Sequence, residues 1–242
     1  MNQVTQGTAT IVERAPGHYA LSIDADGTTY CNAQLDDYHH LARMSYPWCA
    51  PITMSLVARL TGDAMGTWGF GFWNAPYSPL ASRWPALPAT AWFFGNGSGD
   101  LAWDIDSAPT GFKAATLDTR RMRARLLALC APLLLLLMRS KSLYRTIWPR
   151  LTRWLGLSER MLPHDSAWHH YELQWRSDCI TWLVDGIVVH QSSSAPAGSL
   201  GLCIWVDNQW LVAGPRSGLG WGVGPSQTTL EIRELKIKNY EL

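Results

Sequence analysis

Short apolar runs with alternating hydrophobic and polar positions fill both ends of the chain, and each run is bounded by Gly, Pro, Asn or Asp. This pattern is typical of β-strands separated by turns. It predicts strands at residues 18–23, 52–60, 67–73, 90–94, 101–105, 168–175, 180–184, 187–190, 200–206 and 229–238. Because no strand and helix alternation accompanies them, we expect packed antiparallel sheets in a sandwich, not a parallel α/β sheet.

The period changes in the middle of the chain, between residues 118 and 160. Asp118 is a suitable N-cap for a first helix. Its apolar residues recur at steps of three and four: Met122, Leu126, Leu129, Cys130, Leu133, Leu134 and Leu137. A second helix carries Leu143, Ile147, Leu151 and Trp154 on one face. Pro132 predicts a kink in the first helix and Pro149 a bend or break in the second, so the segment is expected to form a helical hairpin.

Composition favours one β domain over residues 1–242, with the hairpin inserted at 118–160. The 242 residues are 47% hydrophobic and 16% charged, and they include 14 Trp and 20 Gly. These values indicate a large core, many turns and broad aromatic surfaces. Five cysteines without a C-x-x-C spacing favour buried thiols over a disulfide framework or a zinc site, and no cofactor is expected.

Charge divides the chain into two unlike parts. Residues 120–160 hold ten of the twenty Lys and Arg against one acid, so this segment carries 10 − 1 = +9 and the remainder 10 − 18 = −8. A basic, Leu- and Trp-rich insert on an acidic body is typical of a protein that meets an anionic membrane or another acidic partner. The apolar face argues against nucleic acid, because it would have no role on a phosphate backbone.

Two readings of the insert remain open. In the first, both apolar faces pack on the sandwich or on a second subunit, and the arginines are solvated. In the second, the insert docks on a membrane or closes as a lid over an apolar site. The residues expected to contribute are Leu133, Leu137, Arg145, Ile147, Trp148, Leu151, Arg153 and Trp154.

Targeting signals are weak in this sequence. The first residues contain neither a cationic start nor an apolar run, which makes a cytoplasmic protein, peripheral to the membrane, the default expectation. The longest apolar run, residues 126–138, is interrupted by Pro132. It falls short of the roughly twenty residues that cross a bilayer, so any contact with lipid is expected at the interface.

Two neighbouring segments carry a resemblance to a known family. The first reads Trp168-His-His-Tyr-Glu-Leu-Gln-Trp175 and the second Ile180-Thr-Trp-Leu-Val-Asp-Gly186. Together they resemble the paired strands of concanavalin A-like lectins and glucanases, particularly family 16 glycoside hydrolases. The segments 69–73, 202–210 and 230–237 resemble further strands of that family. The resemblance implies a jelly-roll sandwich. It does not extend over the insert.

The catalytic motif of family 16 hydrolases, E-x-D-x-x-E or E-x-D-x-E, is absent from this sequence. Asp104 and Asp106 are the nearest substitute, since in a strand they would share one face about 6.6 Å apart. Spacing alone does not exclude glycoside hydrolysis by this pair, although Asp side chains reach less far than Glu. The alternative is a polar turn beside Pro109 and Gly111.

A ligand-binding face is predicted from strands that alternate glycine with aromatic residues. In 67–73, Gly69, Gly71 and Trp73 share one face, and in 218–224 the glycines share another. Because glycine has no side chain, either a ligand or a closely packed neighbouring element can approach these faces. The expected ligand is a glycan, a glycolipid or an apolar small molecule. The residues predicted to contact the ligand are Trp73, Trp92, Trp103, Trp205, Asp207, Asn208, Gln209 and Trp221. Adjacent histidines point to opposite strand faces, so no metal site is predicted.

Overall fold

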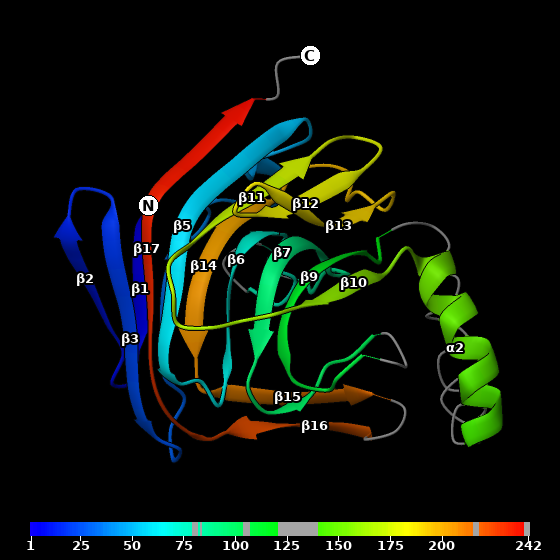
Figure 1. Ribbon diagram of the computed structural model, residues 1–242, viewed down its shortest axis with the longest axis horizontal. Coiled ribbons are helices and arrows are strands. Elements are labelled where there is room, and N and C mark those ends of the chain that lie inside the picture. Colours follow the sequence, from blue (N-terminus) through cyan, green and yellow to red (C-terminus); the bar gives the residue numbers. More distant parts are fainter. Residues whose placement is uncertain (79–81, 83, 104–106, 121–139, 215–217, 240–242) are drawn as a thin grey trace.

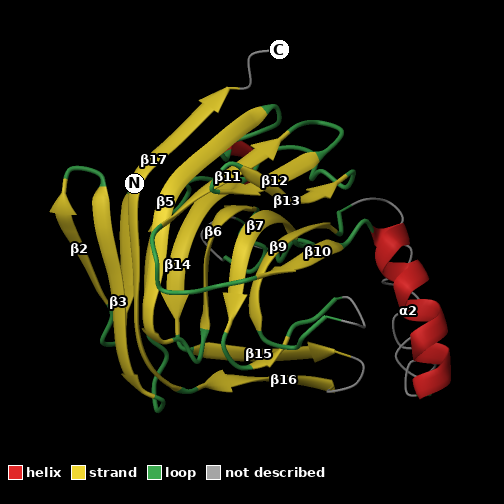
Figure 2. Ribbon diagram, in the orientation of Figure 1, coloured by secondary structure: helices red, strands yellow, loops and turns green. Residues whose placement is uncertain are grey.

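Two twisted antiparallel sheets face each other in the computed structural model (Figure 1). It describes residues 1–78, 82, 84–103, 107–120, 140–214 and 218–239. The predicted sandwich is confirmed, since most elements are strands and they form two seven-stranded sheets (Figure 2).

The first sheet orders its strands β1 (Asn2–Gln6), β4 (Asn32–Asp36), β14 (Gly201–Asp207), β6 (Thr67–Trp73), β7 (Ala89–Asn96), β9 (Gly111–Asp118) and β10 (Ser158–Leu162). The second sheet orders them β13 (Ile187–Ser192), β12 (Ile180–Val184), β11 (His169–Trp175), β5 (Ile52–Asp63), β17 (Pro225–Asn239), β3 (His18–Asp26) and β2 (Thr10–Ala15). A small third sheet contains β16 (Gly218–Val223), β15 (Gln209–Gly214) and β8 (Gly99–Asp100). A short 3-10 helix, η1 (Arg43–Ser45), precedes β5.

The core lies between the two large sheets and is rich in aromatic rings. Alternation along β6 and β7 turns Phe70, Phe72 and Phe93 inward, where each is fully buried. Trp175 and Trp182 of the second sheet are also fully buried, and the Phe72 and Trp175 ring centroids lie 5.6 Å apart. Such rings bury large apolar areas, so they account for much of the attraction between the sheets.

Most predicted strands are present, and β6 and β12 match the predicted bounds. The predicted strand 101–105 is not confirmed: residues 101–103 form a loop after β8, and 104–106 lie outside the described residues. The sequence analysis missed β1, β2, β4, β8, β9, β10 and β15. These strands are short or carry charged residues, so their hydrophobic alternation is weak.

The bounds of the insert need correction. Asp118 is the last residue of β9, where its Oδ1 accepts a hydrogen bond from Arg120 N at 3.1 Å, and residues 158–160 belong to β10. Since β9 and β10 are hydrogen-bonded neighbours, with Thr116 opposite Ser158, the insert leaves and re-enters the sheet at the same edge. A long connection is tolerated there because its ends are already close together. Residues 121–139, and with them the predicted first helix, lie outside the described residues.

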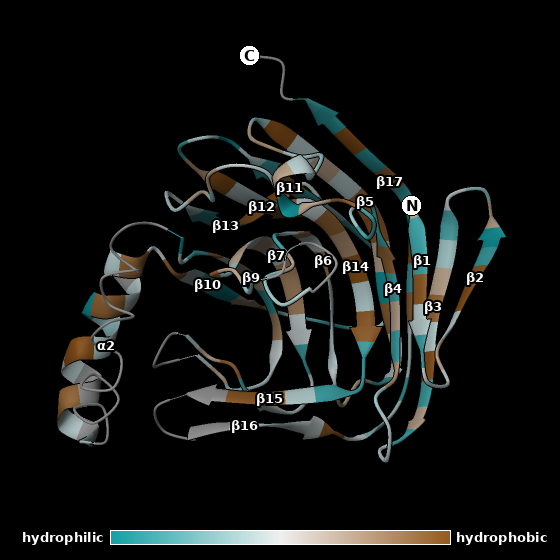
Figure 3. Cartoon of the chain, turned by 180° about the vertical axis from the view of Figure 1, so that it is seen from behind, coloured by the Kyte–Doolittle hydropathy of each residue, from teal (hydrophilic) through white to brown (hydrophobic). Residues whose placement is uncertain are grey.

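The second predicted helix is present as α2 (Lys141–Leu155), at the opposite end of the molecule from β2 (Figure 1). It runs through Pro149 without interruption, so the predicted break is wrong. Apolar residues recur along its length (Figure 3). Ile147 and Leu151 are half-buried, whereas Leu143 and Trp154 are each 42% exposed. No described helix combines the length and apolar character needed to cross a bilayer.

The cysteines follow the prediction in part. Cys31 and Cys203 are buried free thiols, but Cys49 is exposed and Cys179 half-buried. Cys130 lies outside the described residues. Cys49 belongs to the irregular segment before β5, where no strand alternation turns side chains toward the core.

Candidate functional site

An aromatic cluster covers the outer face of the first sheet, opposite the core. We call Trp73, Trp92, Phe94, Trp205 and Tyr38 the aromatic surface. The Trp92 ring centroid lies 5.3 Å from that of Phe94, 5.4 Å from that of Trp205 and 6.2 Å from that of Trp73. Phe94 and Trp205 are buried, whereas Trp73 and Trp92 are half-buried. Three predicted ligand-contacting tryptophans therefore form one continuous surface.

Hydrogen bonds hold two of these indoles in place. Trp73 Nε1 donates to the Tyr38 hydroxyl at 2.5 Å, and Trp205 Nε1 donates to Thr67 Oγ1 at 3.0 Å. Burial raises the pKa of Tyr38, which therefore stays a neutral phenol. Trp92 differs, because its buried Nε1 has no hydrogen-bond partner among the described residues. A buried donor without an acceptor is costly, which makes this nitrogen a candidate contact for a bound molecule.

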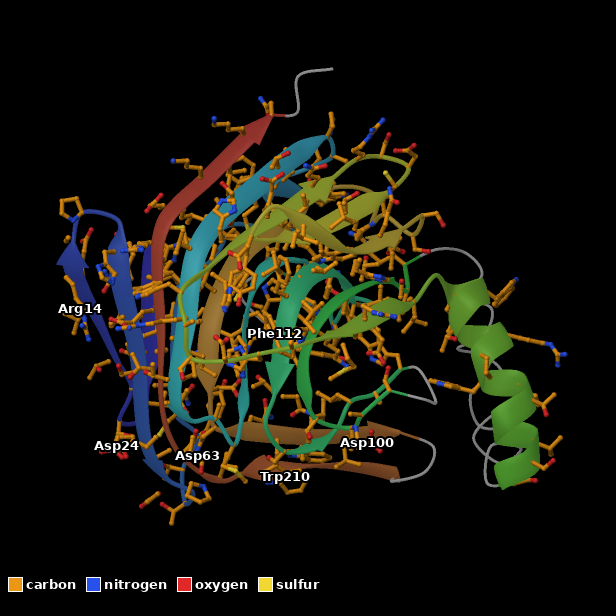
Figure 4. All side chains as sticks on the ribbon, viewed as in Figure 1. Arg14, Asp24, Asp63, Asp100, Phe112 and Trp210 are labelled. Carbon is orange, nitrogen blue, oxygen red and sulfur yellow. The ribbon has the colours of Figure 1, made fainter. Side chains whose placement is uncertain are left out.

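The glycines of β6 make room for neighbouring groups of the same sheet. A Cβ at Gly69 would lie 3.0 Å from the Trp205 ring, and a Cβ at Gly71 would lie 2.6 Å from Trp92 Cβ. In the β15–β16 hairpin, a Cβ at Gly222 would lie 2.6 Å from the indole of Trp210, which is labelled in Figure 4. Of the two readings of these glycines, close packing explains all three positions.

The predicted polar contacts Asp207, Asn208 and Gln209 lie where β14 ends and β15 begins. Asn208 Oδ1 accepts from Cys31 N at 2.8 Å, while its Nδ2 donates to the carbonyl oxygens of Thr29 and Gly224. Asp207 Oδ1 accepts from the backbone nitrogens of Thr67 and Gln209, both at 3.0 Å. Both side chains are buried and join chain segments that are far apart in sequence. Gln209 is half-buried.

A buried ion pair, Lys113 with Glu159, connects the loop that carries Trp103 to the border of the aromatic surface. Lys113 Nζ lies 2.7 Å from Glu159 Oε2, 5.7 Å from the Phe94 ring centroid and 5.3 Å from that of Trp103. Glu159 Oε1 also accepts from Trp103 N at 2.8 Å. Burial lowers the pKa of Lys113, and the Glu159 carboxylate opposes this shift. Glu159, counted above as the acid of the insert, thus belongs to the sheet.

Helix α2 is tied to the same loop. Trp148 Nε1 donates to the Trp103 carbonyl oxygen at 2.6 Å, so the insert meets the sandwich beside the aromatic surface. Of the other residues predicted to act at a membrane or lid, Arg145, Ile147, Leu151, Arg153 and Trp154 also lie in α2. Leu133 and Leu137 lie outside the described residues. Trp221 extends from β16 and is 73% exposed.

The predicted catalytic pair, Asp104 and Asp106, lies outside the described residues. Other carboxylates near the aromatic surface are engaged in structural contacts. Asp36 is fully buried and accepts from Gln34 Nε2 at 2.7 Å and from His39 N at 2.9 Å. Glu159 and Asp207 are bound as described above. No group of three or more metal-binding side chains is found within the described part of the chain.

Two histidines, His169 and His190, make side-chain contacts that the sequence analysis did not predict. His169 bridges Asp165 (Nε2 to Oδ1, 3.0 Å) and Asp185 (Nδ1 to Oδ2, 2.6 Å), and these hydrogen bonds raise its pKa. His190 Nε2 lies 2.8 Å from Ser158 Oγ, across the edge between the two sheets. Burial lowers the pKa of His190. Both contacts fasten strand connections.

Comparison with known proteins agrees with this architecture. The sequence profile of glycosyl hydrolases family 16 matches residues 158–204, which include β10 to β13. An endo-beta-1,4-glucuronan lyase from the fungus Trichoderma reesei has a similar structure, with TM-score 0.50 and 12% identity over 99% of this chain and 90% of the lyase. The carbohydrate recognition domain of Emp47p also has TM-score 0.50 and 12% identity, over 99% of this chain and 89% of that domain.

The chain has the concanavalin A-like sandwich fold. The resemblance read from the two segments around Trp168 and Gly186 is therefore confirmed at the level of the fold. A sialidase is matched over 17% of its own length, at 11% identity and TM-score 0.48, so this chain spans a small part of that protein. No curated protein matches this chain by sequence.

The buried ion pair of the concanavalin A-like sandwich should be strongly coupled. We expect Lys113→Met to lower the free energy of unfolding by about 3–5 kcal/mol, because it removes the cation that lies 2.7 Å from the buried Glu159 carboxylate. The double variant Lys113→Met with Glu159→Gln should recover most of this loss, since the neutral amide that replaces the carboxylate can still accept from Trp103 N. Urea denaturation of both variants measures the coupling, with exposed Lys238→Met as the control within about 0.5 kcal/mol of the wild type. Equal losses in the single and double variants would contradict a coupled pair.

Asp207 should make stability depend on pH. Burial raises its pKa to about 6, above the ordinary value, so the folded state holds this proton more tightly than the unfolded state. The stabilisation is complete below about pH 4 and is lost as pH rises through about 6, in total about 3 kcal/mol. Unfolding measured across this range should show a fall in wild type that is missing from Asp207→Asn. Parallel pH profiles for the two proteins would refute the shift.

Proposed function

We propose that the protein binds a glycan on the aromatic surface of the first sheet. The observation that carries this proposal is the continuous group of Trp73, Trp92 and Trp205, two of them half-exposed, on the outer face of a concanavalin A-like sheet. Flat indole faces suit the apolar faces of sugar rings, and the unpartnered Trp92 Nε1 can donate to a sugar hydroxyl. The lyase and the carbohydrate recognition domain with similar folds support the same ligand class.

The aromatic surface has the character of a binding site more than of a hydrolytic one. Asp36, Glu159 and Asp207 already accept hydrogen bonds or pair with a lysine, so they are not poised as a nucleophile and an acid. Hydrolysis would therefore depend on Asp104 and Asp106. We keep that reaction as the alternative, because both residues follow the loop that carries Trp103.

We further propose that the insert docks on an anionic membrane beside the bound glycan. Helix α2 carries Lys141, Arg145, Arg150 and Arg153 without an acid, and it exposes Leu143 and Trp154. Cationic and apolar residues on one helix are suited to the lipid interface. The hydrogen bond from Trp148 to the Trp103 loop would then couple membrane contact to the edge of the glycan site.

Binding of soluble β-glucans should depend on Trp92. We expect Trp92→Ala to weaken retardation in affinity gels at least about tenfold, or about 1.4 kcal/mol, because it removes the centre of the aromatic surface. Trp168→Ala is the matched control, since the Trp168 ring contacts the guanidinium groups of Arg59 and Arg233, which belong to the other sheet. Equal effects of both changes would sink the proposal. Release of reducing ends that Asp104→Asn abolishes would instead establish the hydrolase alternative.

Membrane docking should depend on where positive charge lies and not on its total. We expect co-sedimentation with anionic but not neutral vesicles, weakened by salt. The double variant Arg145→Glu with Arg153→Glu should lose at least about 2 kcal/mol, or about thirtyfold in affinity. The same charge change at exposed Lys236 and Lys238 of β17 is the control and should retain binding. A protein that stays in the supernatant at low salt disproves docking.

A further inference from the structure

A cleft opens at one end of the sandwich, between the two large sheets. Its volume is about 420 Å³, and it is lined from β5, β6 and β9 and from the connection between β10 and β11. Its residues include Trp68, Phe112 and His164, with Asn96 and Asp165 beside them. It involves none of the tryptophans of the aromatic surface, because Trp68 and Phe112 turn toward the interior of the sandwich, where Phe112 is labelled in Figure 4.

Aromatic rings form the wall of this cleft. Trp68 stacks on Phe112 with centroids 4.6 Å apart and an angle of 11° between the rings. The His164 ring lies 4.7 Å from the Trp68 ring and 5.4 Å from the Phe112 ring. Burial against these rings lowers the pKa of His164, so at neutral pH the imidazole offers one hydrogen-bond donor and one acceptor.

One polar atom of the cleft, Asn96 Oδ1, has no hydrogen-bond partner among the described residues. Asn96 is 2% exposed, and its Nδ2 donates to the Pro109 carbonyl oxygen at 3.1 Å, which sets the orientation of the amide. Asn96 Oδ1 is then a buried acceptor to which no described residue donates. A buried polar atom of this kind normally finds a partner, so it marks a place where a ligand donor would be stabilised.

Charge in the cleft disfavours an anion. The charged lining residue is Asp165, whose carboxylate accepts from Ala167 N and from His169. No lysine or arginine contributes to the described lining. A neutral molecule with hydroxyl groups can donate to Asn96 and exchange hydrogen bonds with His164, while a ring face packs against the aromatic wall.

We propose that this cleft is a second binding site, which takes a neutral, hydroxyl-bearing ring of monosaccharide size. The volume lies within the range of small-molecule sites. The site is separate from the glycan surface proposed above, so either one can exist without the other.

The test is an NMR titration of the full chain with D-glucose, with D-glucuronate as the anionic counterpart. We expect saturable shifts of the Trp68 indole and Asn96 amide signals with glucose, and at least tenfold weaker binding of glucuronate. His164→Ala, a change in the loop between β10 and β11, should weaken glucose binding at least tenfold while β-glucan retention is unchanged. Trp92→Ala should leave the glucose shifts intact.

Three results would overturn the proposal: no saturable shift at Trp68, equal affinity in His164→Ala and wild type, or loss of the shifts in Trp92→Ala. The third result would place glucose on the aromatic surface. Failure of β-glucan binding with intact glucose shifts would instead reject the glycan surface and leave the cleft standing.

Discussion

Alternation of aromatic side chains along β6 and β7 is the constraint on which the rest of the structure depends. Successive residues of a strand face opposite sides, so Phe70 and Phe93 enter the core while Trp92 and Phe94 face outward. The central strands of the first sheet thereby form a wall of the core and the floor of the aromatic surface at once. A shift of one residue in register would exchange these two roles.

The insert depends on the edge of the same sheet. Its ends are held by the paired strands β9 and β10, and the Lys113–Glu159 ion pair crosses between those strands. The pair also contacts the backbone of Leu101 and Trp103, so one buried interaction joins the sheet edge to the loop. Trp148 extends this connection to α2. Hydrogen bonds therefore link α2 through the Trp103 loop to Glu159, and Lys113 continues the connection to the Phe94 ring.

Polar residues near the aromatic surface illustrate how burial changes their use. Asp207 and Asn208 are chemically suited to bind sugars, but in the structure they bind backbone groups of distant segments. Trp92 Nε1 and Asn96 Oδ1 remain without partners among the described residues. Buried polar groups without a partner are rare in folded proteins. Of those among the described residues, Trp92 Nε1 lies in the aromatic surface and Asn96 Oδ1 beside the cleft, so these two atoms are better candidates for recognition than the carboxylates, which already have partners.

Local pattern in the sequence determined the long central strands of the sandwich, the strand pair around Trp168 and Gly186, and helix α2. It succeeded there because period-two and period-3.6 repeats directly report which side chains are buried. It also grouped Trp73, Trp92 and Trp205 as predicted ligand contacts, and the structure brings these three rings together on one face. The tertiary structure decided what the pattern left open: β10 pairs with β9 and buries Glu159, Asn208 becomes a structural contact, and the glycines accommodate indole rings. Those outcomes depend on residues far apart in the chain, whose proximity is set by sheet order and not by local spacing.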